Sequence, residues 1–192
     1  MRGSSIPGYD HARSHVRPSR NTALLQTIGT DLEFFRSRAI LCFRNDTVSE
    51  INADLLNLLG GETRIYHSVD RTDIDDAENG RAPLPQEFLR SLEPASLPPA
   101  RLYLKVGAPI MLLRNLYPAE GLCNGTRLLV TRLGERCIQC SILGGVFHGQ
   151  IRVIPRIKLS TTEDEAPWII TQRQLQVRLC FAITVKIGRA HV

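Results

Sequence analysis

Residues 101–133 read RLYLKVGAPIMLLRNLYPAEGLCNGTRLLVTRL, and their pattern decides the fold of the chain. Apolar runs over residues 102–105 and 110–113 flank a kink at 107–109, and an alternating run follows over 127–133. Asn124-Gly125, just before the last run, is a strong signal for a tight turn. The stretch therefore predicts three short antiparallel strands.

The β pattern continues beyond this stretch. Runs over residues 136–143 and 146–154 follow, and glycine-containing turns separate the strands about every ten residues. Short strands at this spacing are typical of a small antiparallel β-barrel of SH3-like or OB-like type. Such barrels commonly bind nucleic-acid strands through basic and aromatic side chains on one face.

An α/β pattern precedes the proline linker at residues 98–99. The compact apolar run over 38–43 predicts a buried strand, and Thr47–Glu50 has the pattern of a capping box that opens a helix ended by Gly60. A strand over 65–68 and short helices over 27–35 and 87–92 are also predicted. Arg44 and Asn45 follow the first strand, where α/β folds place ligand contacts, so they are candidates for a nucleotide cleft. The alternative is that Asn45 only caps the helix.

Charge is distributed unevenly along the 192 residues. The net charge is +5, but nine basic and two acidic residues lie between Arg101 and Lys158, which leaves −2 for the remainder. This asymmetry fits a segment that contacts phosphates. A solvated sheet face with incidental arginines would give the same count. Aromatic residues are sparse, so phosphate contact is better supported than base stacking.

Cysteine usage argues against a zinc site, and hydropathy argues against a membrane-spanning segment. The five cysteines are an odd number without regular spacing, which fits a reducing compartment. Cys137 and Cys140 form a C-x-x-C pair, but a zinc site needs a second pair, so no metal is expected. No apolar run approaches the ~18 residues that span a bilayer, so no membrane partner is expected.

Four segments together resemble the Pif-type DNA helicases, especially the Helitron-transposon branch. LPPARLYLKVGAPIMLLRNL (97–116) and GLCNGTRLLVTRLG (121–134) resemble the signature of that family. AILCFRNDTVSEIN (39–52) resembles a strand and helix of its second motor domain, and QRQLQVRLCFAITV (172–185) resembles the return into that domain. The resemblance covers roughly residues 36–185, in the order and spacing of the family.

The resemblance implies an α/β fold, namely a partial RecA-like domain with an inserted small antiparallel SH3-like or OB-like β-barrel. The complete protein would be an ATP-dependent helicase that moves 5′-to-3′ on single-stranded DNA, with ATP and Mg²⁺ between two RecA-like domains. The implied divisions are a leader (1–25), part of the second RecA-like or 2A domain (26–97), the 2B barrel (98–158), the return to 2A (159–185) and a non-native tail (186–192).

The same resemblance implies the partners and the site. The partners are single-stranded DNA and an N-terminal motor domain that this chain lacks, and the expected location is the nucleus. Asn124, Gly125 and Thr126 fall on motif positions, although hairpin geometry alone would also explain the Asn-Gly pair. The expected DNA contacts are Lys105, Arg114, Asn115, Arg127 and Arg132.

Two departures from the family bear on activity. The sequence contains no G-x-x-x-x-G-K-[ST] motif, whose backbone cradles the ATP phosphates. After Val185 the tail KIGRAHV does not match the family, so Arg189 is not assigned as an arginine finger. We therefore expect a helicase fragment that needs no cofactor alone and does not hydrolyse ATP alone. A stand-alone nucleic-acid-binding module and a degenerate transposon relic remain alternatives.

Overall fold

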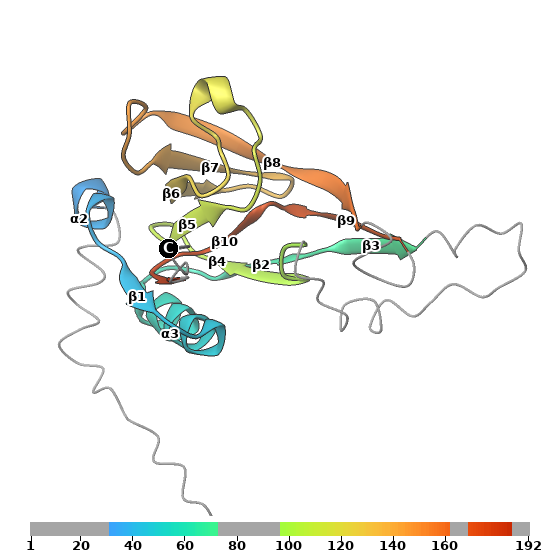
Figure 1. The fold of residues 1–192 in the computed structure, drawn as a ribbon, viewed down its shortest axis with the longest axis horizontal. Helices are drawn as coiled ribbons and strands as arrows, with labels where there is room; N and C mark the ends of the chain where they lie inside the picture. Colours follow the sequence, from blue (N-terminus) through green and yellow to red (C-terminus); the bar gives the residue numbers. More distant parts are fainter. Residues whose placement is uncertain (1–30, 73–96, 162–168, 186–192) are drawn as a thin grey trace, which may run out of the picture.

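The computed structural model describes residues 31–72, 97–161 and 169–185. Within them, a large curled antiparallel sheet lies beside a small α/β unit (Figure 1). The leader, the tail and the helix predicted over 87–92 lie outside the described residues. Among the described helices, none is long and apolar enough to cross a membrane.

The α/β unit consists of β1 (Ile40–Cys42), α3 (Asn45–Leu58) and β11 (Ala182–Thr184), with β1 and β11 paired in parallel. The buried side chain of Asn52 joins α3 to β11: its Nδ2 donates to the Ala182 oxygen at 3.1 Å, and its Oδ1 accepts from the Ala182 nitrogen at 2.9 Å. The predicted order of strand, short loop and helix is confirmed. The capping box is not, because α3 already begins at Asn45 and its N-cap Arg44 makes no side-chain cap bond.

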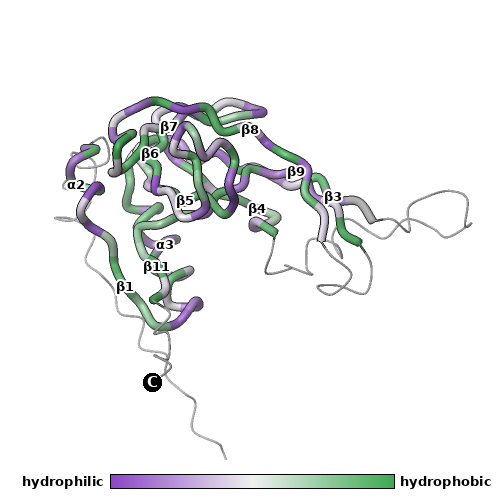
Figure 2. The backbone as a smooth tube through the Cα atoms, turned by 45° about the horizontal axis from the view of Figure 1, so that its top comes forward, coloured by the Kyte–Doolittle hydropathy of each residue, from purple (hydrophilic) through white to green (hydrophobic). Residues whose placement is uncertain are grey.

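Strand β1 is more exposed than the apolar run predicted. Leu41 is 64% exposed and Phe43 is 77% exposed, and the strand appears green in Figure 2. Among the described residues β1 pairs with β11 alone, so no further strand covers its other edge. The prediction of a buried strand is therefore wrong for this part of the chain.

Seven strands form the large sheet, in the order β10-β5-β6-β7-β8-β9-β3. A separate antiparallel pair joins β2 (Arg64–His67) to β4 (Arg101–Leu104). The strands of the large sheet are β3 (Val69–Thr72), β5 (Pro109–Leu112), β6 (Arg127–Leu133), β7 (Cys137–Ile142), β8 (Ile151–Ser160), β9 (Ile170–Leu175) and β10 (Val177–Leu179).

Strands β5, β6 and β7 lie where the apolar runs predicted them, β3, β9 and β10 were not predicted, and β8 differs in its bounds. It begins at Ile151 instead of residue 146 and continues to Ser160. The backbone φ is positive at Gly144, Gly145 and Gly149, which favours a loop rather than an extended strand at this point.

The sheet is open, with β3 and β10 as its edges. Gln176 alone separates β9 from β10, so one bent segment bonds first to β8 and then to β5. This bend curls the sheet around an apolar core. The described residues therefore do not form the closed SH3-like or OB-like barrel predicted from strand spacing, because β9 also pairs with β3 and the two edge strands do not pair with each other.

Both faces of β6 are buried at residues 128–130. Leu128 and Val130 face the inner core, whereas Leu129 faces a second core shared with the α/β unit. Phe35, Leu56 and Phe181 belong to that second core. The burial of both faces explains why residues 128–130 are continuously apolar instead of alternating.

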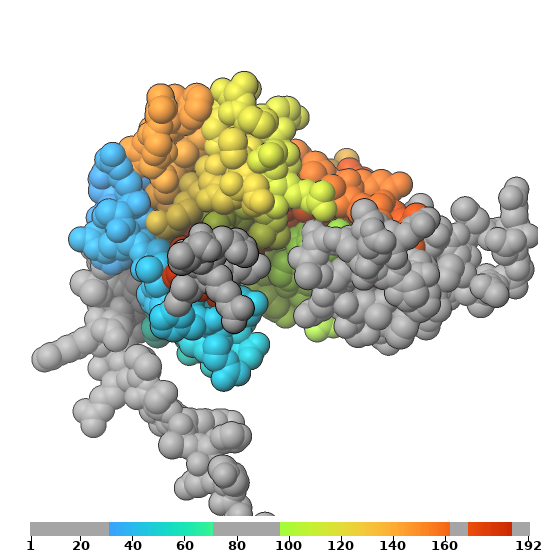
Figure 3. Space-filling model, in the orientation of Figure 1, coloured from blue at the N-terminus to red at the C-terminus, as the bar shows by residue number. Residues whose placement is uncertain are grey.

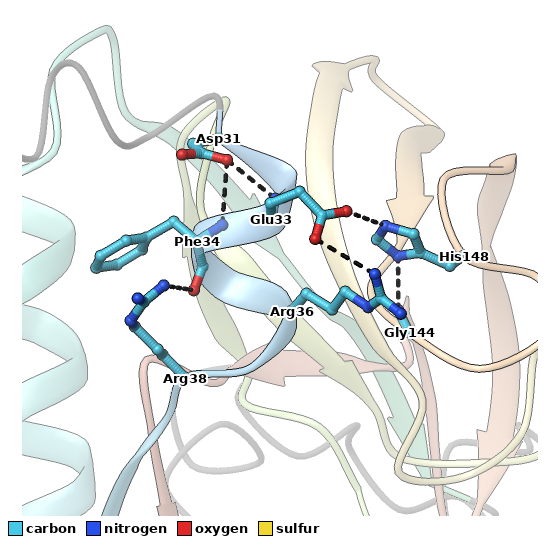
Figure 4. A network of polar contacts seen from close by, with 7 residues as sticks. All are labelled: Asp31, Glu33, Phe34, Arg36, Arg38, Gly144 and His148. Atoms are coloured by element: carbon cyan, nitrogen blue, oxygen red, sulfur yellow. Dashed lines mark hydrogen bonds and ion pairs between the residues drawn. The ribbon is translucent and has the colours of Figure 1, made fainter.

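Helix α2 (Leu32–Arg36) is fastened to the β7–β8 loop by a polar network (Figure 4). Asp31 caps the helix by accepting from the Glu33 and Phe34 nitrogens. His148 Nδ1 accepts from the Gly144 nitrogen at 2.9 Å, which places the ring proton on Nε2, 2.8 Å from Glu33 Oε1. The hydrogen bond from His148 lowers the pKa of Glu33. The blue helix and the orange loop therefore lie in contact in Figure 3. Helix α2 confirms the described part of the helix predicted over residues 27–35.

Replacing Asn52 with Ala should lower the free energy of unfolding by about 2–3 kcal/mol, because the amide and carbonyl of Ala182 lose their buried partner. Urea denaturation measures the change. Asn57→Ala is the matched control, since Asn57 is exposed on the same helix and should change stability by less than ~0.5 kcal/mol. Equal effects of the two substitutions would show that the Asn52 bridge does not hold α3 to β11.

Candidate nucleic-acid interface

Two arginines flank Met111 on the outer face of the large sheet, the face that turns toward the α/β unit. Met111 pairs with Arg127 of β6 on one side and with Arg178 of β10 on the other. Directly opposed residues on paired strands project from the same face, so the two guanidinium groups form one basic row. Arg178 is exposed, and its side chain has no hydrogen bond or ion pair with any described residue.

Arg178 was not among the predicted contacts. Its position depends on the pairing of β10 with β5, in which Arg178 lies opposite Met111, 67 positions earlier in the sequence. A lone arginine within an apolar segment is only a weak signal in sequence. The basic row therefore became visible only through the register of the sheet.

Arg127 combines its place in this row with a structural bond. The side chain is half-buried, and its Nη2 donates to the Arg38 oxygen at 2.7 Å, which ties β6 to the segment before β1. It also lies beside the thiol of Cys180, whose pKa is raised by burial and lowered in part by Arg127. Only part of the Arg127 guanidinium is thus free to meet a ligand.

The loop between β5 and β6 presents Arg114 at the same end of these strands as Arg127. Arg114 is exposed, and the Oδ1 atom of Asn115 accepts from the Asn124 nitrogen at 2.8 Å. Thr126 Oγ1 donates to the Gly121 oxygen at 2.9 Å. Asn115 and Thr126 therefore hold the loop in shape and position Arg114.

The Asn-Gly pair is part of this longer loop instead of a two-residue hairpin. Strand pairing ends at Met111 and Arg127, and the connection contains the short 3-10 helix η3 (Pro118–Glu120). Gly125 adopts a φ of 85°, a conformation that glycine adopts without steric cost. The predicted tight turn is thus confirmed within the longer loop, because the Thr126 nitrogen donates to the Cys123 oxygen at 3.0 Å across Asn124 and Gly125.

Lys105 lies in a different environment from the other predicted contacts. It is 7% exposed, and its Nζ donates to the Leu59 oxygen at 2.6 Å, at the carboxyl end of α3. A cation is favourable there because the last carbonyls of a helix lack partners and carry negative potential. The structure thus makes Lys105 a cap for α3.

Arg132 lies at the far end of β6. It is exposed and follows a register shift between Val130 and Arg132. Five residues separate it from Arg127, or about 17 Å along an extended strand. The structure therefore brings Arg114, Asn115 and Arg127 together at one end of the sheet and leaves Arg132 apart from them.

Arg44 and Asn45 lie where the sequence placed them, at the carboxyl edge of the parallel pair β1–β11. Thr184 Oγ1 donates to Asn45 Oδ1 at 2.5 Å, and Arg44 pairs with Asp46 at 3.2 Å on the surface. Both side chains are exposed, so they are accessible to a ligand at this edge. A nucleotide role for them stays a prediction.

The candidate metal residues give no cluster. No group of three or more His, Cys, Asp or Glu side chains that could hold a metal ion is present among the described residues. Cys137 and Cys140 lie on one strand three positions apart, which directs them to opposite faces. Burial raises the pKa of the Cys140 thiol to about 12, which disfavours the thiolate that a metal ligand requires.

Replacing Lys105 with Met tests whether this residue caps helix α3 or contacts DNA phosphates. As a helix cap, it should stabilise the fold, so the variant should lose about 1–2 kcal/mol in urea unfolding. The salt dependence of DNA binding should stay unchanged. A decrease of about 0.7 in the slope of log K against log salt would instead make Lys105 a phosphate contact.

Comparisons with known proteins identify similar sequences and folds. Residues 87–133 match the family model of the 2B domain of the DNA helicase Pif1. No curated protein matches the sequence. Unliganded Pif1 from Bacteroides sp. shares 24% identity and a TM-score of 0.54, with 82% of this chain and 44% of that chain covered. Pif1 from Candida albicans shares 19% identity and a TM-score of 0.56 over 85% of this chain and 44% of that chain.

A third structure, of two coordinating Pif1 helicases that unwind forked double-stranded DNA, shares 26% identity and a TM-score of 0.54. It covers 86% of this chain and 33% of that chain. The chain thus spans less than half the length of each of these helicases. Residues 87–133 thus match the 2B domain of Pif1, and the described residues have the fold of the corresponding part of Pif1 helicases.

Proposed function

We propose that this chain is part of an ATP-dependent 5′-to-3′ DNA helicase and supplies single-stranded DNA contacts together with part of the second motor domain. The observation that carries the proposal is the basic row of Arg127 and Arg178, with Arg114 at the same end of the sheet. The row lies on the sheet that contains the Pif1-type 2B segment. A Bacteroides Pif1 structure of the same fold is bound to single-stranded DNA, with 24% identity and a TM-score of 0.52 over 77% of this chain and 31% of that chain.

The proposed contacts are electrostatic. Guanidinium groups form strong charge-assisted hydrogen bonds with phosphate oxygens, and binding releases counterions from the DNA. Arg178 and Arg114 are both exposed, so they need give up no structural bond to meet a phosphate. Arg127 is a weaker contributor because it also bonds the Arg38 carbonyl.

The strand pairing also refines the proposed division of the chain. Strands β9 and β10 bond to β8 and β5, so we include residues 170–179 with the 2B strands instead of with the return to 2A. Only β11, which pairs with β1, then belongs to the motor domain after the insertion. On this view the boundary follows Leu179.

We further propose that the complete protein binds ATP and Mg²⁺. A Bacteroides Pif1 of the same fold is in complex with ADP-AlF4. In this chain Arg44 and Asn45 offer a cation and an amide at the carboxyl edge of β1, which fits contact with a phosphate. The sequence lacks the phosphate-binding loop, so we assign no catalytic step to these residues.

The double variant Arg114→Ala, Arg178→Ala should bind single-stranded DNA at least tenfold more weakly at low salt. The slope of log K against log salt should fall by about 1.4, or about 0.7 for each lost phosphate contact. Fluorescence anisotropy with a labelled oligothymidine measures both quantities, and circular dichroism verifies the fold.

Arg101→Gln is the control, because it removes one positive charge from an exposed position on β4, outside the basic row. Its binding should match that of the unchanged chain. Unaltered affinity in the folded double variant would overturn the proposed DNA contacts.

The 192-residue chain alone should show no DNA-stimulated ATP hydrolysis, since no G-x-x-x-x-G-K-[ST] motif is present to hold the phosphates. A coupled phosphate-release assay with saturating oligothymidine measures this activity. Hydrolysis that is abolished by Arg44→Ala would show that the chain holds a working nucleotide site.

A further inference from the structure

A second basic surface lies on the inner face of the large sheet, the face that also bears the core. Arg173 of β9 pairs directly with Lys158 of β8, and Arg156, two residues before Lys158, pairs with Leu175. The Arg156 backbone nitrogen also donates to the Arg136 backbone oxygen, so Arg136, just before β7, lies directly opposite Arg156. Side chains two apart on a strand and directly opposed on its neighbour share a face. We call Arg136, Arg156, Lys158 and Arg173 the inner basic cluster.

The inner basic cluster has no countercharge among the described residues. The four salt bridges of this part of the chain involve other cations. Like charges placed directly opposite on paired strands destabilise a sheet, and Lys158 and Arg173 are such a pair, both exposed. Two exposed cations held side by side in this way form a surface that attracts an anionic partner.

Arg156 forms the floor of the cluster. Its Nη2 donates to the backbone oxygens of His67 and Arg173, while its buried Nε has no partner among the described residues. Partial burial and the charge of Arg173 lower the pKa of Arg156. The guanidinium is thus oriented by carbonyl groups while its full positive charge remains uncompensated.

Arg64 adds a further cation beside the cluster. Its guanidinium lies 5.7 Å from the ring centroid of Tyr66, and its Nη1 donates to the Leu133 oxygen. The Tyr66 hydroxyl donates to the Gly134 oxygen at 2.7 Å and lies within electrostatic reach of both Arg64 and Arg156. The uncharged Tyr66 ring and Leu133 carbonyl therefore position Arg64, just as uncharged backbone carbonyl groups position Arg156.

The cluster and the Arg127–Arg178 row lie on opposite faces of the sheet. Arg156 and Arg173 share the face of Ile154 and Leu175, which belong to the inner core. Arg127 and Arg178 share the outer face with Leu129, which packs on the α/β unit. A DNA strand that lies on the row therefore leaves the inner cluster free.

We propose that the inner basic cluster binds the phosphodiester backbone of a second DNA segment. Alternate residues of β8 place Arg156 and Lys158 about 6.8 Å apart, close to the rise of two nucleotides of a DNA strand. Beyond Lys158 the same face offers the paired hydroxyls of Ser160 and Thr171, whose oxygens are 2.8 Å apart, as further hydrogen-bonding groups for phosphate oxygens. The choice of DNA rests on the proposed function, but the residues are separate.

The test uses the 192-residue chain and a forked DNA with two single-stranded arms. In the double variant Lys158→Gln, Arg173→Gln, two exposed charges are removed without change to the core. The slope of log K against log salt should fall by about 1.4, and affinity near 0.1 M salt should fall roughly 25-fold. Arg101→Gln should leave both unchanged, and circular dichroism confirms folding.

Comparison with Arg114→Ala, Arg178→Ala separates the two proposals. Because the surfaces are distinct, the losses should add in the combined variant. Loss of fork binding only in the Arg114, Arg178 variant would overturn the inner site and leave the proposed function standing. Loss only in the Lys158, Arg173 variant would support the inner site and overturn the row. Competition by polyglutamate as strong as that by unlabelled DNA would overturn the assignment to DNA in favour of an acidic protein.

Discussion

The bend at Gln176 is the constraint on which the arrangement of the large sheet depends. Before it, Leu175 pairs with β8, and after it Val177 pairs with β5. The Gln176 oxygen itself accepts from the Leu113 nitrogen at 3.0 Å. One segment thus joins the two ends of the β5–β8 meander, and the sheet must curl around the apolar side chains between them.

Gln174, two residues before the bend, strengthens this constraint. Gln174 is fully buried, and its Nε2 donates to the Tyr66 oxygen at 2.9 Å and to the Pro99 oxygen at 3.3 Å. The amide therefore ties β9 to β2 and to the proline linker before β4. An apolar side chain at this position would leave backbone carbonyls without a partner inside the protein, which is costly. The buried Gln174 side chain thus helps to fix the position of the β2–β4 pair relative to the large sheet.

The bend also determines where the charges lie. Arg173, before the bend, faces inward beside Lys158, whereas Arg178, after it, faces outward in line with Arg127. Two short strands of one segment thereby supply cations to opposite faces. The outer row adjoins the α/β unit through the bond from Arg127 to the Arg38 carbonyl, so a ligand on the row would contact a residue that also holds the segment before β1.

The sequence by itself determined the local elements and the charge. The apolar residues within 127–133 predicted β6, the apolar run before Arg44 predicted β1, and the excess of arginines predicted a phosphate-binding surface, because these signals depend only on near neighbours. Only the tertiary structure decided which cations lie together on one face. It buried Lys105 at the end of α3, separated Arg132 from Arg127, and brought in Arg178. These outcomes depend on strand register and on contacts between residues far apart in the chain, and the spacing of residues within one segment carries no information about either.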